Sequence, residues 1–212
     1  GIYWKYESWL KKMDSELYSV VGAAGELFSI RKSLFIEVEP NAILDDFIIS
    51  LRIAQQGYLV KYEPQAYSVE MASSSVEDEI KRKVRISAGG IQSIIWLKDL
   101  LNPIKHGILS FQYISHRVLR WTLTPLALAF VLITNLILAY GTNGLYDYLL
   151  VLQLGFYLLA LLGWLLENYK IKIKALFVPF YFTMMNVCVY LGFLRFLRGR
   201  QSVVWEKARR AQ

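Results

Sequence analysis

The sequence predicts an α/β fold followed by membrane helices. Over the first hundred residues, segments with the twofold periodicity of strands alternate with segments of helical periodicity. After Asn102-Pro103, long apolar runs dominate the sequence instead. The 212 residues are 55% hydrophobic and carry a formal net charge of +7. This balance is typical of a membrane protein with Lys and Arg on its cytoplasmic side, and it argues against a nucleic-acid-binding protein.

Residues 1–102 are predicted to form the α/β part. Apolar residues recur at helical spacing through residues 4–17, and again from Asp45 to a C-capping signal at Gly57. Between and after these helices lie short apolar segments bounded by Gly and Pro, as strands are. The elements expected in chain order are a helix at 4–17, a strand end and loop at 19–28, a short strand at 29–31, a helix at 45–56, a strand at 58–62 and a basic helix at 77–92.

The rest of the chain is predicted to meet and cross a membrane. Residues 103–120 suit a helix in the membrane interface, with Ile104 and Phe111 on one face and Gln112 and His116 on the other. An ordinary surface helix is the alternative. The membrane region 121–196 contains three uncharged runs, each near the roughly 20 residues that cross a bilayer. The expected spans are 121–140, 148–166 and 175–194, and a basic tail occupies 197–212.

The loop charges leave the membrane topology open. The loop 141–147 has no Lys or Arg and is expected outside, whereas three lysines place the loop 167–174 in the cytoplasm. The basic tail is also expected in the cytoplasm, which three full crossings would forbid. Either the third run re-enters or lies at the interface, bent at Pro179, or the charge rule does not hold here.

Three short motifs suit sugar transfer from an activated phosphate donor. The Gly-Ala-Ala-Gly loop at 22–25 lets backbone approach a sugar closely. Asp45 and Asp46 open a helix, where either carboxylate can take a proton from an attacking hydroxyl or simply cap the helix. Arg82 and Arg85 lie three residues apart, so both can grip a diphosphate leaving group or form a solvated basic face.

Taken together and in this order, the motifs resemble the family 2 glycosyltransferases of the integral-membrane kind. That group contains cellulose, chitin and hyaluronan synthases and bacterial exopolysaccharide glycosyltransferases. The resemblance covers nearly the whole chain and is strongest over residues 3–92. It implies inverting transfer of a hexosyl or N-acetylhexosaminyl group on a GT-A fold. It also implies a nucleotide-sugar donor, a polysaccharide or lipid-linked acceptor, and a bacterial inner membrane whose cytoplasmic face carries the catalytic part.

The resemblance assigns roles to the acid pair and the arginines. It makes Asp46 the general base, with Asp45 beside it. The family's Gln-x-x-Arg-Trp motif falls on Arg82, Arg85 and Ile86, so its Gln and its Trp are both replaced here. Arg82 and Arg85 are expected at the donor diphosphate. Because the family's Trp stacks on the acceptor sugar in processive synthases, Ile86 favours short or non-processive synthesis.

The same resemblance assigns the other site residues. The loop residues expected at the acceptor are Gly22, Ala23, Ala24 and Gly25. Trp205 in the basic tail matches the tail motif that approaches the nucleotide, and is expected at the donor diphosphate. Glu70 stands where the family often has an acid, and it receives no role.

A divalent metal, Mg²⁺ or Mn²⁺, is implied for the full-length enzyme, but the Asp-x-Asp motif that binds it does not occur in this sequence. Cys188 and the two histidines, His106 and His116, do not make a metal cluster either. The family's first strands and its earlier nucleotide-binding acids are also missing here. The expectation is a carboxy-terminal fragment that begins mid-protein and transfers no sugar by itself.

A second function from another class stays open. A non-catalytic membrane accessory or transport protein can retain the same scaffold. Charged residues within the spans would favour transport, and the three runs contain none. Glycosyl transfer is therefore the favoured prediction.

Overall fold

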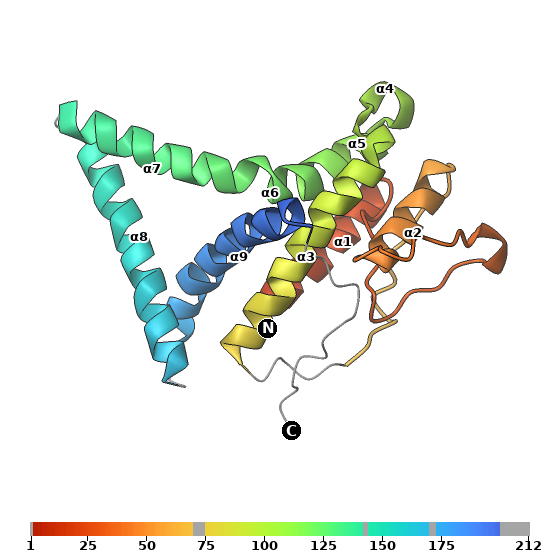
Figure 1. Ribbon diagram of the computed structural model, residues 1–212, viewed down its shortest axis with the longest axis horizontal. Helices are drawn as coiled ribbons and strands as arrows, with labels where there is room; N and C mark the ends of the chain where they lie inside the picture. Colours follow the sequence, from red (N-terminus) through yellow and green to blue (C-terminus); the bar gives the residue numbers. More distant parts are fainter. Residues whose placement is uncertain (1, 70–74, 142–143, 170–172, 200–212) are drawn as a thin grey trace.

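The computed structural model describes residues 2–69, 75–141, 144–169 and 173–199. Helices joined by irregular loops make up this part of the chain (Figure 1). The helices before the candidate spans are α1 (Ile2–Leu17), η1 (Lys32–Leu34), α2 (Asp45–Gln55), α3 (Val76–Trp96), η2 (Lys98–Leu101), α4 (Pro103–His106), α5 (Ile108–Tyr113), η3 (Ile114–Val118) and α6 (Leu119–Trp121). The last three are α7 (Leu123–Gly141), α8 (Leu145–Asn168) and α9 (Lys174–Leu197).

The predicted α/β fold is wrong, since no strand forms among the described residues. The segments predicted at 19–28 and 58–62 do lie side by side, where the Val20 N–H donates to the Val60 carbonyl at 2.9 Å. The Val60 N–H, however, donates to the side-chain oxygen of Ser19 at 3.0 Å. A ladder needs successive backbone bonds, and here a hydroxyl replaces one of them. The strand predicted at 29–31 leads directly into η1.

The three helices predicted in the first hundred residues are confirmed. Gly57 directly follows the last turn of α2 and has φ +91°, which glycine adopts without strain. At the start of α3, the Ser75 side chain accepts from the Asp78 N–H at 3.1 Å, and the first turn is acidic. Both features are local end signals, which explains why these helices could be recognised from sequence.

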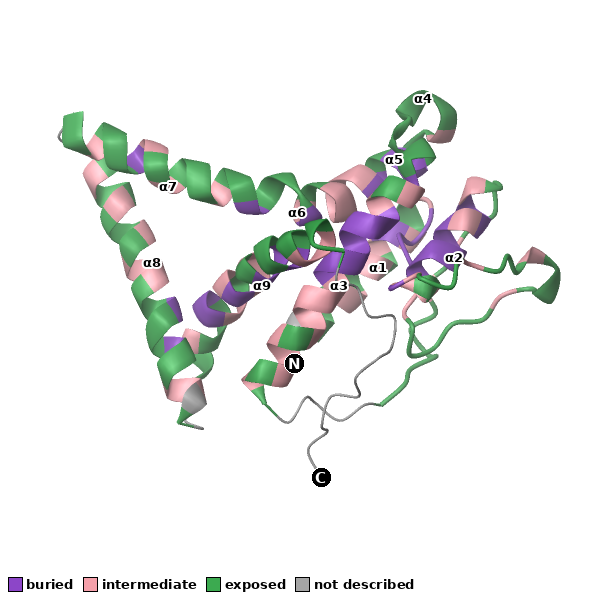
Figure 2. Ribbon diagram, viewed as in Figure 1, coloured by how far each residue is buried: buried purple, intermediate pink, exposed green. Residues whose placement is uncertain are grey.

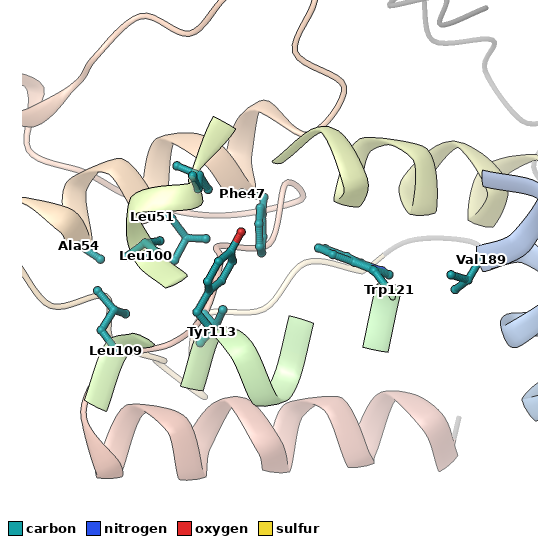
Figure 3. Close-up of a cluster of buried hydrophobic side chains, with 10 residues drawn as sticks. Phe47, Leu51, Ala54, Leu100, Leu109, Tyr113, Trp121 and Val189 are labelled. Atoms are coloured by element: carbon teal, nitrogen blue, oxygen red, sulfur yellow. The ribbon is translucent and has the colours of Figure 1, made fainter. Parts of the chain in front are cut away.

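The main core lies where α2, α3 and α5 meet, and buried residues concentrate there (Figure 2). Its largest side chains are Phe47, Tyr113 and Trp121, which Figure 3 shows with their aliphatic neighbours. The ring of Phe47 meets that of Trp121 edge-on, with 5.5 Å between ring centroids. The full cluster is Val21, Phe47, Leu51, Ala54, Leu97, Leu100, Leu109, Tyr113, Trp121 and Val189.

The region predicted as one interface helix at 103–120 is broken. Gly107, at φ +54°, separates α4 from α5, and the chain then widens into the π-helix η3. Ile104 is 96% exposed and Phe111 63% exposed, so the predicted apolar face does point away from the protein. The predicted polar face packs inward instead, because Gln112 is fully buried.

Three of the described helices are long and apolar enough to cross a membrane, and each overlaps a predicted span. They are α7, α8 and α9, and α9 continues through Pro179 without a break. Only 11% of the most apolar stretch of α7 and of α8 is buried within the protein, so most of their apolar surface needs lipid or another chain to cover it. In Figure 1, α7 and α8 extend away from the core and α9 returns to pack along α3.

The packing of α9 on α3 depends on Gly192. A Cβ added there would lie 2.5 Å from Ser87 Cβ and 2.9 Å from the Ala88 nitrogen. Gly192→Val is therefore expected to destabilise the protein by about 1–3 kcal/mol, the usual cost of overpacking. Thermal unfolding in detergent measures this. Gly155→Val is the matched control, because Gly155 is also in an apolar helix but has open space around it. Equal losses in both variants would contradict this account.

Candidate functional site

The site is built around the first turn of α2, which α3 fixes in place through the preceding loop. The Ile43 N–H donates to Gln92 Oε1 at 3.0 Å, and Gln92 Nε2 donates to the Asn41 carbonyl at 3.0 Å. Two turns earlier on α3, Arg85 donates to the Ile43 carbonyl at 3.3 Å. A Cβ on Gly89 would lie 2.8 Å from Ile43 Cγ2, so the glycine allows this close approach. These contacts determine where Asp45 and Asp46 begin the helix.

The glycine loop docks on the same end of α2. The Ala23 N–H donates to Ser50 Oγ at 2.9 Å, and the Ser50 hydroxyl lies 2.9 Å from the Asp46 carbonyl oxygen. Gly22, at φ +90°, leaves room for the ring of Phe47, which a Cβ there would overlap. A Cβ on Gly25 would lie only 3.0 Å from Asp46 Oδ2. The structure therefore brings the predicted acceptor loop and the predicted base together.

Asp46 has the electrostatic environment of a weakened acid. Burial raises the pKa of its carboxyl, and the negative charges of Asp45 and Glu26 raise it further. The N–H of Phe47 at the start of α2 opposes that shift. Asp45 itself is exposed. The fold thus increases the proton affinity of Asp46.

The two predicted arginines have different surroundings. Arg82 donates to both oxygens of Glu79, at 3.0 and 3.1 Å, one turn earlier on α3. Arg85 lies near the acid pair: burial lowers the pKa of its guanidinium, and the charges of Asp45 and Asp46 counteract that shift. Of the two arginines, Arg85 is therefore the one that lies beside the start of α2.

Sequence reasoning missed a polar cluster between α1 and the segment before α7. Asp14, only 5% exposed, accepts from Gln112 Nε2 at 3.0 Å and lies 3.0 Å from His116 Nδ1. Arg117 donates through Nε and Nη2 to the Val21 carbonyl, at 3.2 Å each. The available signal was the i,i+4 spacing of Gln112 and His116, which places them on one helical face.

The predicted site residue Trp205 lies outside the described residues, as does Glu70, which has no predicted role. Within the described ranges, no group of three His, Cys, Asp or Glu side chains could hold a metal ion.

Comparison with known proteins gives one match. The sequence model of the family described as Glycosyl transferase family group 2 matches residues 7–194. These residues include α2, the glycine loop, the arginines of α3 and most of the three apolar helices. No curated protein and no solved structure is similar enough to add to this assignment. The match covers most of the 212 residues, and the chain therefore belongs to glycosyl transferase family group 2.

Proposed function

We propose that this protein transfers a sugar, with inversion, from a nucleotide-sugar donor to a polysaccharide or lipid-linked acceptor at a membrane. Membership of the family supports glycosyl transfer in general. The observation that carries the finer proposal is Asp46, a partly buried carboxyl with a raised pKa beside the glycine loop. In an inverting transfer, one carboxylate takes the acceptor's proton while its oxygen attacks the sugar.

Asp46 fits the role of that base in position and in chemistry. Among the described residues it takes part in no salt bridge, although the charges of Arg85 and Lys11 lie near enough to interact with it. Its raised pKa strengthens it as a proton acceptor, and a base is most effective when its pKa approaches the operating pH. The lack of a side chain on Gly25 lets another group approach Asp46 Oδ2.

Arg85 is proposed to stabilise the departing nucleoside diphosphate. A guanidinium binds phosphate oxygens through paired N–H groups, and electrostatic stabilisation of a leaving group lowers the barrier directly. Arg85 lies near Asp45 and Asp46, whereas Arg82 is held by Glu79. Arg85 is therefore proposed to bind more of the negative charge on the leaving diphosphate than Arg82 does.

The proposed setting is a bacterial inner membrane, with transfer at its cytoplasmic face. The three apolar helices support a membrane location, and the exposed Ile104 and Phe111 provide a surface that lipid can cover. A divalent Mg²⁺ or Mn²⁺ would supply charge neutralisation at the donor diphosphate. The proposal assigns that metal no ligand among the described residues.

A donor screen tests the proposal. The full-length protein in membrane vesicles is incubated with radiolabelled UDP-hexoses, UDP-N-acetylhexosamines and GDP-hexoses, with Mg²⁺ or Mn²⁺ present. Incorporation from at least one donor by the wild type, and its loss in Asp46→Asn, is the expected result. A wild type that incorporates label from none of these donors would contradict the proposal.

Arg85→Gln is expected to lower kcat by about 10- to 100-fold, because the leaving group loses a charged hydrogen-bond donor. The rate of label transfer at saturating donor measures this. Arg82→Gln is the comparison, and its loss is expected to be smaller because Arg82 is engaged with Glu79. A larger loss in Arg82→Gln than in Arg85→Gln would reverse the assignment of the two arginines.

A further inference from the structure

The segment that leads into the first candidate span reaches the proposed site through one side chain. Arg117 belongs to the five-residue π-helix η3 and lies six residues before α7 begins. Its guanidinium donates twice to the Val21 carbonyl, and Val21 directly precedes the glycine loop. The Val21 side chain is fully buried, so the residue at which the glycine loop begins is held in the core.

The same guanidinium lies over two aromatic rings of the core. Its central carbon is 5.8 Å from the ring centroid of Phe47 and 6.0 Å from that of Trp121. Contacts of this length are cation–π interactions. Phe47 follows Asp46 in the chain, so Arg117 touches both sides of the site: the loop through Val21 and the base through its neighbour.

Two glycines allow this junction to form. A Cβ on Gly22 would lie 2.2 Å from Phe47 Cδ2, and a Cβ on Gly90 of α3 would lie 2.4 Å from Trp121 Cδ2. The rings of Phe47 and Trp121 therefore occupy the space that a side chain at position 22 or 90 would need. The two rings, the glycine loop and Arg117 are therefore closely packed. If the guanidinium were removed, the Val21 carbonyl would lose both of these donors.

We propose that Arg117 is a positioning residue for sugar transfer, which holds the glycine loop against Asp46 from the segment that enters the membrane. The inference rests on the proposed role of Asp46 and adds a residue that touches neither donor nor acceptor. A planar guanidinium suits this position because it donates two parallel N–H groups while its face covers aromatic rings. The ammonium of lysine keeps the charge but cannot donate in this fork geometry.

The kinetic test uses the full-length protein in membrane vesicles with the donor identified by the screen. Arg117→Gln is expected to lower kcat by about 100-fold, the effect of a site group displaced by an ångström. The donor KM is expected to stay within about threefold, because donor binding does not depend on the loop. Arg117→Lys should recover about tenfold of the lost rate, since it keeps the charge.

Arg120→Gln is the matched control, because Arg120 lies one turn further on and pairs with Glu7 of α1 at 2.8 Å. It contributes the same kind of charge to the same segment, and its salt bridge joins that segment to α1. Its kcat is expected within about threefold of wild type. A wild-type kcat in Arg117→Gln, or an equal loss in Arg120→Gln, would overturn the positioning role.

Hydrogen exchange separates this inference from the proposed chemistry. The amides of residues 19–28, including the Ala23 N–H bonded to Ser50, should exchange faster in Arg117→Gln and at the wild-type rate in Arg120→Gln. This measurement uses no sugar. If Asp46→Asn keeps full activity, the proposed base is wrong, while unchanged exchange in Arg117→Gln shows separately that Arg117 does not hold the loop.

Discussion

Asp46→Asn is expected to lower the rate of sugar transfer by about 100- to 10,000-fold, the range over which general-base catalysis contributes. Asparagine keeps the size of the side chain and an oxygen that can accept from the Phe47 N–H, but it takes no proton. The measurement is label transfer by the full-length protein in vesicles, normalised to the amount of protein in the membrane.

The stability of the same variant distinguishes lost chemistry from lost folding. The folded-state pKa of Asp46 is raised by burial, so the stability contributed by this group is complete below the ordinary Asp pKa. It is lost as the pH rises through the raised pKa, and at neutral pH the ionised carboxylate therefore opposes folding. Asp46→Asn is expected to unfold at the wild-type temperature or above it when measured at pH 7.

The raised pKa also sets the direction of the pH–rate profile. Asp46 must be ionised to accept a proton, so kcat should rise with pH through the raised pKa, above the range of an ordinary aspartate. Asp99→Asn is the control for the substitution itself, since Asp99 is held by Lys105 and His106 away from the site. Wild-type turnover in Asp46→Asn with an inactive Asp45→Asn would transfer the role of base to Asp45.

The helices could be predicted because their signals are local. The start of α3 is marked by Ser75, which caps its first turn, and the end of α2 by Gly57, two residues after its last residue. A strand is different, since its state depends on a partner elsewhere in the chain. Residues 58–62 have the alternation of a strand, yet the Val60 N–H bonds to the Ser19 hydroxyl and no ladder follows.

The same contrast holds at the site. Asp46 and Arg85 could be chosen because carboxylate and guanidinium groups suit the chemistry, and the structure does place both near the start of α2. The contacts of Arg117 with Val21 and of Gln112 with Asp14 join residues nearly a hundred positions apart. The sequence predicts the polar face of the 103–120 segment but not its partners, and the structure shows that Gln112 on this face is buried against Asp14.

Gly22→Ala is expected to destabilise the protein by about 2–5 kcal/mol, through two effects that add. Gly22 has φ +90°, outside the conformations that side-chain-bearing residues prefer, which costs roughly 1–2 kcal/mol. The new methyl group would also overlap the ring of Phe47, whose displacement costs about 1–3 kcal/mol. Thermal unfolding in detergent measures the sum.

Gly57→Ala separates these two effects, because Gly57 has nearly the same backbone angle, φ +91°, with nothing within 4 Å of the added Cβ. It should show the backbone cost alone. The difference between the variants then reports the contact with Phe47. If that contact is the cause, Phe47→Leu should cost less in the Gly22→Ala background than in the wild type, because the smaller side chain relieves the overlap. Additive losses would locate the cost of Gly22→Ala in the backbone instead, and would remove the tight packing of Phe47 as the reason that the glycine loop lies against Asp46.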